Sequence, residues 1–170
     1  GIDTTSFHEG LRHIYREAPD VIMIGEMRDR ESIAIALEAA DTGHLVISSL
    51  HANNSVMAIN RIIDVFKAEQ QQQIRVQLAD NLLLSFHQRL LKVRNRDSRV
   101  PAFEKLANSH RVANLIREGK DHHIRNQLVN TEEFVSLDSC LAHLVAEKKV
   151  EREIAQHVCL DKKQFLDMLK

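Results

Sequence analysis

The 170-residue sequence has no tryptophan, two cysteines and no hydrophobic run of the length a membrane span needs. Aromatic residues make up only 4% of the chain, so it has few rings on which nucleic-acid bases could stack. Lys and Arg number 23 against 24 Asp and Glu, a balance without the positive field that nucleic-acid binding uses, and we expect no nucleic acid as a partner. Cys140 and Cys159 form no Cys-x-x-Cys pair, which predicts neither a disulfide framework nor a zinc knuckle and favours a reducing compartment.

Two short apolar runs predict buried strands. The first, Val21–Ile24, ends at Gly25, and the second, Leu45–Ile47, follows a helical pattern over residues 30–41. Another helix is predicted to begin at Asn54 or Ser55. This strand–helix–strand–helix alternation is typical of a parallel α/β sheet whose strands are buried on both faces. Because two parallel strands make a poor sheet, we expect further strands from outside this sequence.

The second half of the sequence predicts mainly helices. Apolar residues at four-residue spacing predict one long helix over residues 68–91, followed by a turn at Asn95–Ser98 between short strands around Lys92 and Val100. Five short helices are predicted over residues 109–118, 124–129, 137–147, 151–158 and 162–169. The expected division is therefore the carboxy-terminal portion of an α/β domain over residues 1–105 and a helical carboxy-terminal subdomain over residues 106–170.

An acidic residue follows the first predicted strand. In the run DVIMIGEMRD, residues 20–29, Glu26 is placed at the carboxyl edge of a parallel sheet, where α/β proteins bind ligands. In nucleotide hydrolases an acid at this position holds Mg²⁺, directly or through water. The pattern by itself also fits a solvated acid at the end of a strand.

Two histidines flank the second predicted strand: His44 precedes it and His51 follows it. Their separation of seven residues across a strand argues against one shared metal ion, and so against a histidine-rich metal-binding domain. At the carboxyl end of its strand, His51 is better placed than His44 to contact a γ-phosphate. The alternative for both residues is an ordinary core or capping histidine.

Several runs resemble segments of the bacterial type II/IV secretion and pilus ATPases. Residues 17–29 (EAPDVIMIGEMRD) resemble the Walker B segment, and residues 39–46 (AADTGHLV) continue it. Residues 49–53 (SLHAN) and 59–66 (INRIIDVF) resemble the histidine box of that family and the helix after it. These segments occur in the order and spacing of the family over more than 40 residues.

Within that superfamily the sequence is most similar to the pilus retraction ATPases of the PilT/PilU type. It lacks the Cys-x-x-Cys pair of the assembly-type motors, and Asn114–Glu118 (NLIRE) resembles the end of a motif characteristic of retraction motors. Arg111–Ala113 (RVA) departs from that motif, which has Ala-Ile-Arg at these positions. The departure leaves open an orthodox retraction motor or a PilU-like accessory paralogue.

The resemblance implies a RecA-like P-loop ATPase core, assembled as a homo-hexamer, that hydrolyses ATP with Mg²⁺ to drive pilus retraction and twitching motility. On this resemblance Glu26 is the Walker B glutamate, which polarises Mg²⁺ or its bound water, and His51 contacts or senses the phosphates. The periphery of the same nucleotide and Mg²⁺ site is expected to include Gly25, Arg28, Asp29 and His44. For Arg28 and Asp29, the alternative is an ordinary surface ion pair.

The sequence contains no Gly-x-x-x-x-Gly-Lys-Ser/Thr phosphate loop. We therefore expect a carboxy-terminal fragment of a longer ATPase that is inactive by itself. The resemblance implies a cytoplasmic protein peripherally associated with the inner membrane, which contacts the platform protein of the pilus and a paralogous retraction ATPase. The alternative function is a non-catalytic accessory or regulatory subunit, which the altered segment at residues 111–113 favours and the presence of Glu26 and His51 disfavours.

Overall fold

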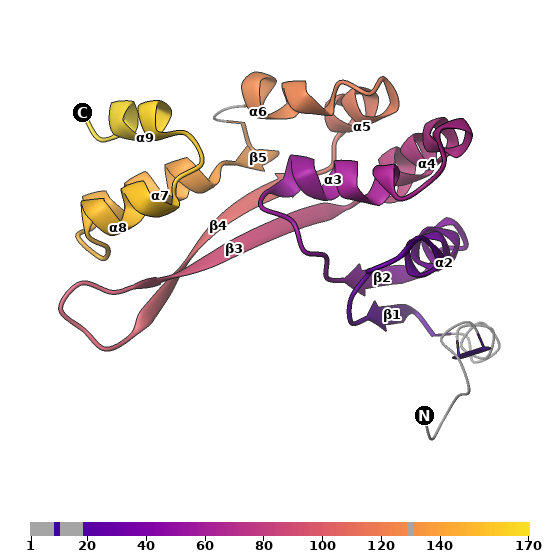
Figure 1. Cartoon of the computed structure of the whole chain (residues 1–170), viewed down its shortest axis with the longest axis horizontal. Coiled ribbons are helices and arrows are strands. Elements are labelled where there is room, and N and C mark those ends of the chain that lie inside the picture. The colour runs from indigo at the N-terminus through magenta and orange to yellow at the C-terminus, as the bar shows by residue number, and fades with distance from the viewer. Residues whose placement is uncertain (1–8, 11–18, 129–130) are drawn as a thin grey trace.

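The computed structural model describes residues 9–10, 19–128 and 131–170, which form two small sheets and the helices packed on them (Figure 1). The first sheet pairs β1 (Val21–Ile24) with β2 (Leu45–Ser48), in parallel, and α2 (Arg30–Asp41) connects them. The second sheet is antiparallel, in the order β3 (Leu84–Lys92), β4 (Arg99–Ala107), β5 (Phe134–Val135). The chain is thus an α/β protein with a parallel sheet, as the sequence predicts.

The parallel pair is buried on one face only. Ile22 and Ile24 pack with residues of α2 on that face. On the other face the alternate side chains of both strands are exposed, Met23 to 78%. The expectation that both faces are buried is therefore wrong for the described residues, because α2 covers a single face of the pair. Two parallel strands with one bare apolar face fit the expectation of further covering elements.

Local side chains define where the helices begin. Asp29 accepts a hydrogen bond from the backbone N–H of Ser32 at 2.8 Å and starts α2 with a capping box. Asn54 accepts one from the backbone N–H of Met57 at 2.8 Å and starts α3 (Ser55–Asp64). Gly43 follows α2 with a φ of 94°, in the left-handed region that glycine adopts without strain. The predicted helix over residues 30–41 is confirmed, and of the two predicted starts of the next helix Ser55 is its first residue and Asn54 its cap.

The long helix predicted over residues 68–91 is wrong. Helix α4 (Ala68–Asn81) ends after 14 residues, and the chain turns into β3. Spacing of four residues fits the period of two of a strand as well as one face of a helix, so Phe86 and Leu90 share one face of β3. Pairing with β4 along nine residues decides in favour of the strand, and the two strands around the turn are correspondingly longer than expected.

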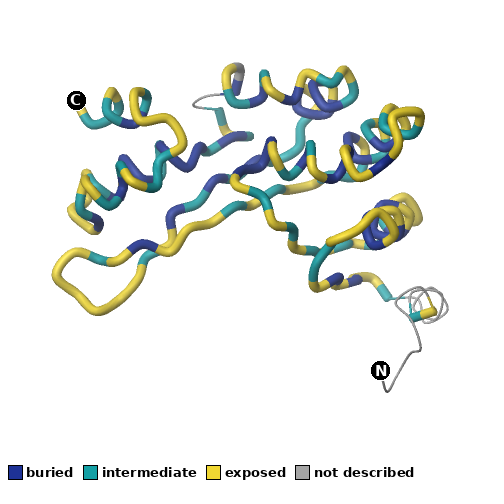
Figure 2. The backbone as a smooth tube through the Cα atoms, viewed as in Figure 1, coloured by how far each residue is buried: buried dark blue, intermediate teal, exposed yellow. Residues whose placement is uncertain are grey.

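Two hydrophobic cores lie along the hairpin β3–β4. The first joins α3, α4, α5 (His110–Arg117) and the short helices η1 (Asp121–His123) and α6 (Ile124–Gln127). The second joins the other end of the hairpin to α7 (Leu137–Ala146), α8 (Arg152–Val158) and α9 (Lys162–Met168). Buried residues lie along β4 and on the sides of these helices that face the hairpin or a neighbouring helix (Figure 2). A division at residue 105 stays a prediction, since the first core includes side chains from both sides of it.

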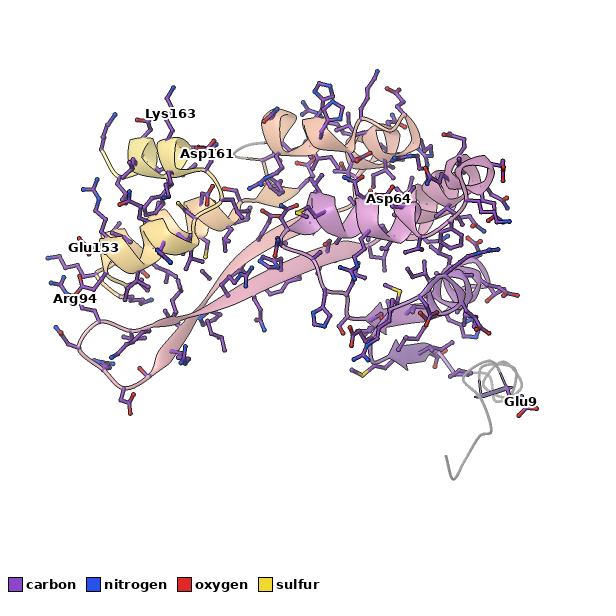
Figure 3. The ribbon with its side chains drawn as sticks, viewed as in Figure 1. Glu9, Asp64, Arg94, Glu153, Asp161 and Lys163 are labelled. Carbon is purple, nitrogen blue, oxygen red and sulfur yellow. The ribbon has the colours of Figure 1, made fainter. Side chains whose placement is uncertain are left out.

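The turn of the hairpin lies at the end of the second sheet that is far from β1 and β2, and it is almost wholly exposed (Figure 2). Arg94 in this turn is labelled in Figure 3, near α8. Its Nε forms an ion pair of 2.8 Å with Oε1 of Glu151, the residue just before α8. The backbone N–H of Arg94 also donates to the carbonyl of Lys149 at 2.8 Å. The end of the hairpin is therefore anchored to the last helices. Within the described part of the chain, none of the helices combines the length and the apolar character that crossing a membrane requires.

Candidate functional site

The carboxyl ends of the two parallel strands bring Glu26 and His51 together. Since β1 and β2 run in parallel and in register from Val21 opposite Leu45, the segments that follow them leave the sheet at the same edge. There Nε2 of His51 lies 3.0 Å from Oε1 of Glu26. The Glu26 side chain is 22% exposed and the His51 side chain 83%, so the pair borders open solvent. The two residues predicted to carry the chemistry are therefore in direct contact.

Arg28 contacts the other oxygen of the same carboxylate. Its Nε and Nη2 lie 2.7 Å and 2.6 Å from Oε2 of Glu26. The hydrogen bond and the positive charge of Arg28 lower the pKa of Glu26 below its usual range, and His51 and Arg61 add smaller contributions. The same contact raises the pKa of Arg28. Glu26 is therefore ionised at neutral pH, as an acid that attracts a cation must be.

The backbone links the two segments that carry Glu26 and His51. The N–H of Met27 donates to the carbonyl of Ser49 at 2.9 Å, and the Ser49 hydroxyl donates to the carbonyl of Gly25. Gly25 therefore contributes its backbone carbonyl oxygen to the link between the two segments. These bonds continue the parallel pairing past the ends of the strands, so that the distance between Glu26 and His51 is determined by the backbone as well as by their own contact.

Asp29 lies beside this site, but its side chain caps the beginning of α2. Its carboxylate accepts the backbone N–H of Ser32 and the Ser32 hydroxyl at 3.1 Å. The hydrogen bond from the Ser32 backbone is the main reason why the pKa of Asp29 is lowered. Because Asp29 holds the first turn of α2, it fixes where the loop after Glu26 ends.

His44 is not part of this constellation, so the expectation that it lies at the same site is corrected. It precedes β2 and therefore lies at the opposite edge of the sheet from His51. Its Nδ1 is 3.1 Å from the carbonyl oxygen of Ala39 and 3.1 Å from the hydroxyl of Thr42. These contacts place His44 at the end of α2, as a capping histidine.

The residues present fit a magnesium ion held through water. Mg²⁺ usually takes one or two carboxylates and fills its remaining positions with water and substrate phosphates. Glu26 offers one ionised carboxylate, and each of its oxygens can accept a further hydrogen bond beside His51 or Arg28. Within residues 9–10, 19–128 and 131–170, no three His, Cys, Asp or Glu residues are grouped to enclose an ion. The edge can thus contribute to a nucleotide–magnesium site but does not enclose one.

Two residues near this edge were not predicted from the sequence. Arg61 of α3 donates from Nη1 to the backbone carbonyl of His51 at 2.9 Å. Glu104 of β4 is fully buried and accepts the backbone N–H of Ser55, the first residue of α3, at 2.7 Å. A signal for Glu104 exists in the alternation of Val100, Ala102, Glu104 and Leu106, which puts one charge in an otherwise apolar row. Nothing in the sequence indicates that Arg61 donates a hydrogen bond to the carbonyl of His51.

Comparison with known proteins assigns the chain to a family. The family described as "Type II/IV secretion system protein" matches residues 2–168. Over 156 residues the chain is 40% identical to the type IV pilus retraction ATPase PilT of Pseudomonas aeruginosa, covering 91% of this chain and 45% of the relative. Over 157 residues it is 37% identical to the type IV pilus ATPase PilU of the same organism, covering 91% of this chain and 41% of the relative.

A solved structure shows the same fold. The chain superimposes on the crystal structure of the pilus retraction motor PilT with bound ADP at a TM-score of 0.88 and 38% identity. The match covers 96% of this chain and 46% of the other. The chain therefore spans less than half of the length of these relatives.

Proposed function

Because the chain belongs to the family of type II/IV secretion system proteins, we propose that it is part of an ATP-hydrolysing motor of type IV pilus retraction. The observation that carries the proposal is the contact of Glu26 with His51 at the carboxyl edge of the parallel pair. The relatives named above are pilus ATPases, and the matching structure binds ADP. The phosphate loop would be contributed by a part of the protein outside this sequence.

Each residue at the edge has a role in this proposal. Ionised Glu26 would hold the water shell of Mg²⁺ and orient one of its waters. A bound Mg²⁺ supplies positive charge that offsets the negative charge of the phosphates. His51, which is exposed and tied to Glu26, presents its ring toward the γ-phosphate. Arg28 keeps Glu26 ionised through its charge and its hydrogen bonds.

The assembled motor would be a homo-hexamer with a RecA-like core. The bare face of β1 and β2 supports the larger RecA-like core, since the apolar side chains Val21, Met23, Leu45 and Ile47 require covering elements. The proposed setting is the cytoplasmic side of the inner membrane, with the pilus platform protein and a paralogous retraction ATPase as partners. A ring suits this work because a site completed by a neighbouring subunit couples hydrolysis to movement of one subunit against the next.

A second candidate function is a non-catalytic accessory subunit of such a motor. It is favoured by Arg111–Ala113, where the retraction motif would place its arginine at position 113. Ala113 is buried in the first core, whereas Arg111 is exposed. The positive charge of this segment is thus on a different side of α5 than the motif would put it, which would change what the helix contacts in a ring.

ATP hydrolysis by the complete gene product distinguishes the two functions. We expect magnesium-dependent turnover that falls by about 100-fold in Glu26→Gln, because the amide keeps the shape of the side chain but not its charge. His51→Ala is expected to lower turnover as well. Glu38→Gln removes an exposed carboxylate from α2 and serves as the control with unchanged turnover. A folded, nucleotide-binding wild-type ring without turnover would favour the accessory subunit instead.

A further inference from the structure

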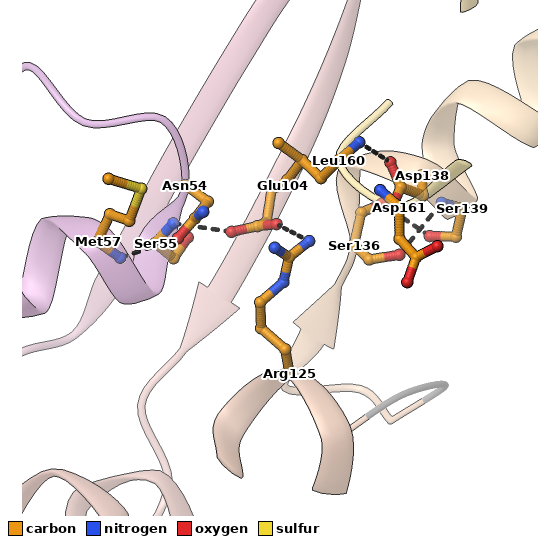
Figure 4. Close-up of polar contacts among 10 residues, drawn as sticks. All are labelled: Asn54, Ser55, Met57, Glu104, Arg125, Ser136, Asp138, Ser139, Leu160 and Asp161. Atoms are coloured by element: carbon orange, nitrogen blue, oxygen red, sulfur yellow. Dashed lines mark hydrogen bonds and ion pairs between the residues drawn. The ribbon is translucent and has the colours of Figure 1, made fainter. Parts of the chain in front are cut away.

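A buried carboxylate on the hairpin contacts the helix that follows His51. Glu104 has an exposed fraction of 0%, and its Oε1 accepts the backbone N–H of Ser55 at 2.7 Å (Figure 4). Ser55 is itself buried and is the first residue of α3. A buried carboxylate is costly unless it is hydrogen-bonded or paired, so this contact holds the start of α3 against β4.

The second oxygen of Glu104 faces α6. Nη2 of Arg125, in α6, lies 3.6 Å from Oε2, and this oxygen accepts no hydrogen bond among the described residues (Figure 4). His87 is opposite Glu104 on β3, but burial lowers its pKa, so its ring is neutral at neutral pH. Arg125 is therefore the cation that compensates Glu104, and the carboxylate lies between α3 and α6.

Contacts of known length lead from α3 to the candidate site. Arg61, in the same helix, donates to the carbonyl of His51 at 2.9 Å. His51 in turn lies 3.0 Å from Glu26. Only three residues separate His51 from Ser55. A displacement of the start of α3 would therefore be transmitted to His51 both through the chain and through Arg61.

Another buried carboxylate shows how Glu104 differs. Asp138 is also 0% exposed, but both of its oxygens accept backbone N–H groups, from Leu160 at 2.7 Å and from Asp161 at 2.9 Å (Figure 4). Asp138 thus ties one loop of the second core to α7 and uses both oxygens to do so. Glu104 divides its two oxygens between a helix start and a partly exposed arginine of another element.

We propose that Glu104 is a positioning residue that sets the start of α3, and with it His51, and that Arg125 makes this position depend on α6. The inference rests on the proposed function only in assigning His51 to the nucleotide site. It follows that movement of α6 changes the distance between His51 and Glu26. Helix α6 would thereby control how close His51 lies to Glu26.

Hydrogen exchange of the full-length protein tests the contact directly. In Glu104→Ala we expect amides in residues 49–58 to exchange about tenfold faster than in wild type. Glu104→Gln keeps an acceptor for the Ser55 N–H and is expected to stay within about twofold. Asp138→Asn is the matched control, with faster exchange at Leu160 and Asp161 and unchanged exchange at residues 49–58. Wild-type exchange of residues 49–58 in a folded Glu104→Ala protein would overturn the proposal.

Variants of Arg125 test its role separately, and they also test the proposal if Glu104→Ala does not fold. In the wild-type background, Arg125→Gln is expected to speed amide exchange of residues 49–58 about threefold. In the Glu104→Gln background, where residue 104 carries no charge to compensate, adding Arg125→Gln is expected to cause no further change. Equal effects in both backgrounds, or no effect in either, would refute the coupling to α6.

ATP turnover by the same full-length variants separates this inference from the proposed function. In Glu104→Ala we expect kcat to fall about tenfold with KM within twofold, because His51 is displaced while substrate binding elsewhere is retained. Faster exchange with unchanged kcat would show that Glu104 does not position a catalytic group. If wild type hydrolyses no ATP, the proposed function fails, and the exchange experiments still decide the structural part.

Discussion

Asn54 offers a test of how much the start of α3 contributes to stability. Its side-chain Oδ1 accepts the backbone N–H of Met57 at 2.8 Å, and the residue is 9% exposed, so water cannot easily replace the lost acceptor. Replacing a capping asparagine by alanine costs about 1 kcal/mol on average, and about 2 kcal/mol at the upper end. Because Asn54 is buried and α3 supplies Val56, Ile59 and Ile63 to the first core, we expect Asn54→Ala to cost about 1–2 kcal/mol.

Thermal unfolding of the 170-residue chain, followed by far-ultraviolet circular dichroism, measures this cost. For a protein of this size about 1 kcal/mol shifts Tm by roughly 2–4 °C. Asn54→Ser should recover most of the loss, because serine caps nearly as well as asparagine. Asn53→Ala is the matched control, since Asn53 is exposed and its hydrogen bond from Arg89 is long at 3.4 Å. Equal Tm values for Asn53→Ala and Asn54→Ala, or no recovery with serine, would refute the assignment of Asn54 as the cap.

Two further predictions concern the candidate site and the second core. Arg28→Ala should raise the pKa of Glu26 toward its ordinary value, as measured by NMR titration of the side-chain carboxyl; an unchanged pKa would contradict the assigned cause. Since the folded-state pKa of Glu26 is depressed, its contribution to stability is present above the unfolded-state pKa and is lost as pH falls through the folded-state value, and Arg28→Ala should reduce this acid dependence. Phe165 is fully buried in the second core, so Phe165→Ala should lower the free energy of unfolding by about 3–5 kcal/mol in urea titrations, whereas Lys163→Ala on the exposed side of α9 should change it by less than about 0.5 kcal/mol.

The sequence predicted the elements whose signals are local. The apolar runs of β1 and β2 and the periodic helix between them were recognisable because burial and helix capping depend on residues a few positions apart. Helix capping is local in the same way at Ser109, Ser136 and Asp161, whose side chains accept hydrogen bonds from the first turns of α5, α7 and α9. The candidate site was predicted because Glu26 and His51 each follow a predicted strand and each lie in a segment that resembles a motif of the family.

Tertiary structure decided the rest, because it depends on pairing between distant residues. Residues 84–92 became a strand only by pairing with β4, since their apolar spacing fits a helix equally well. His44 was separated from Glu26 by the direction of β2, which places the two ends of that strand at opposite edges of the sheet. Glu104 acquired its importance from a contact across 49 positions with Ser55, and no local pattern specifies which backbone group a buried carboxylate will accept.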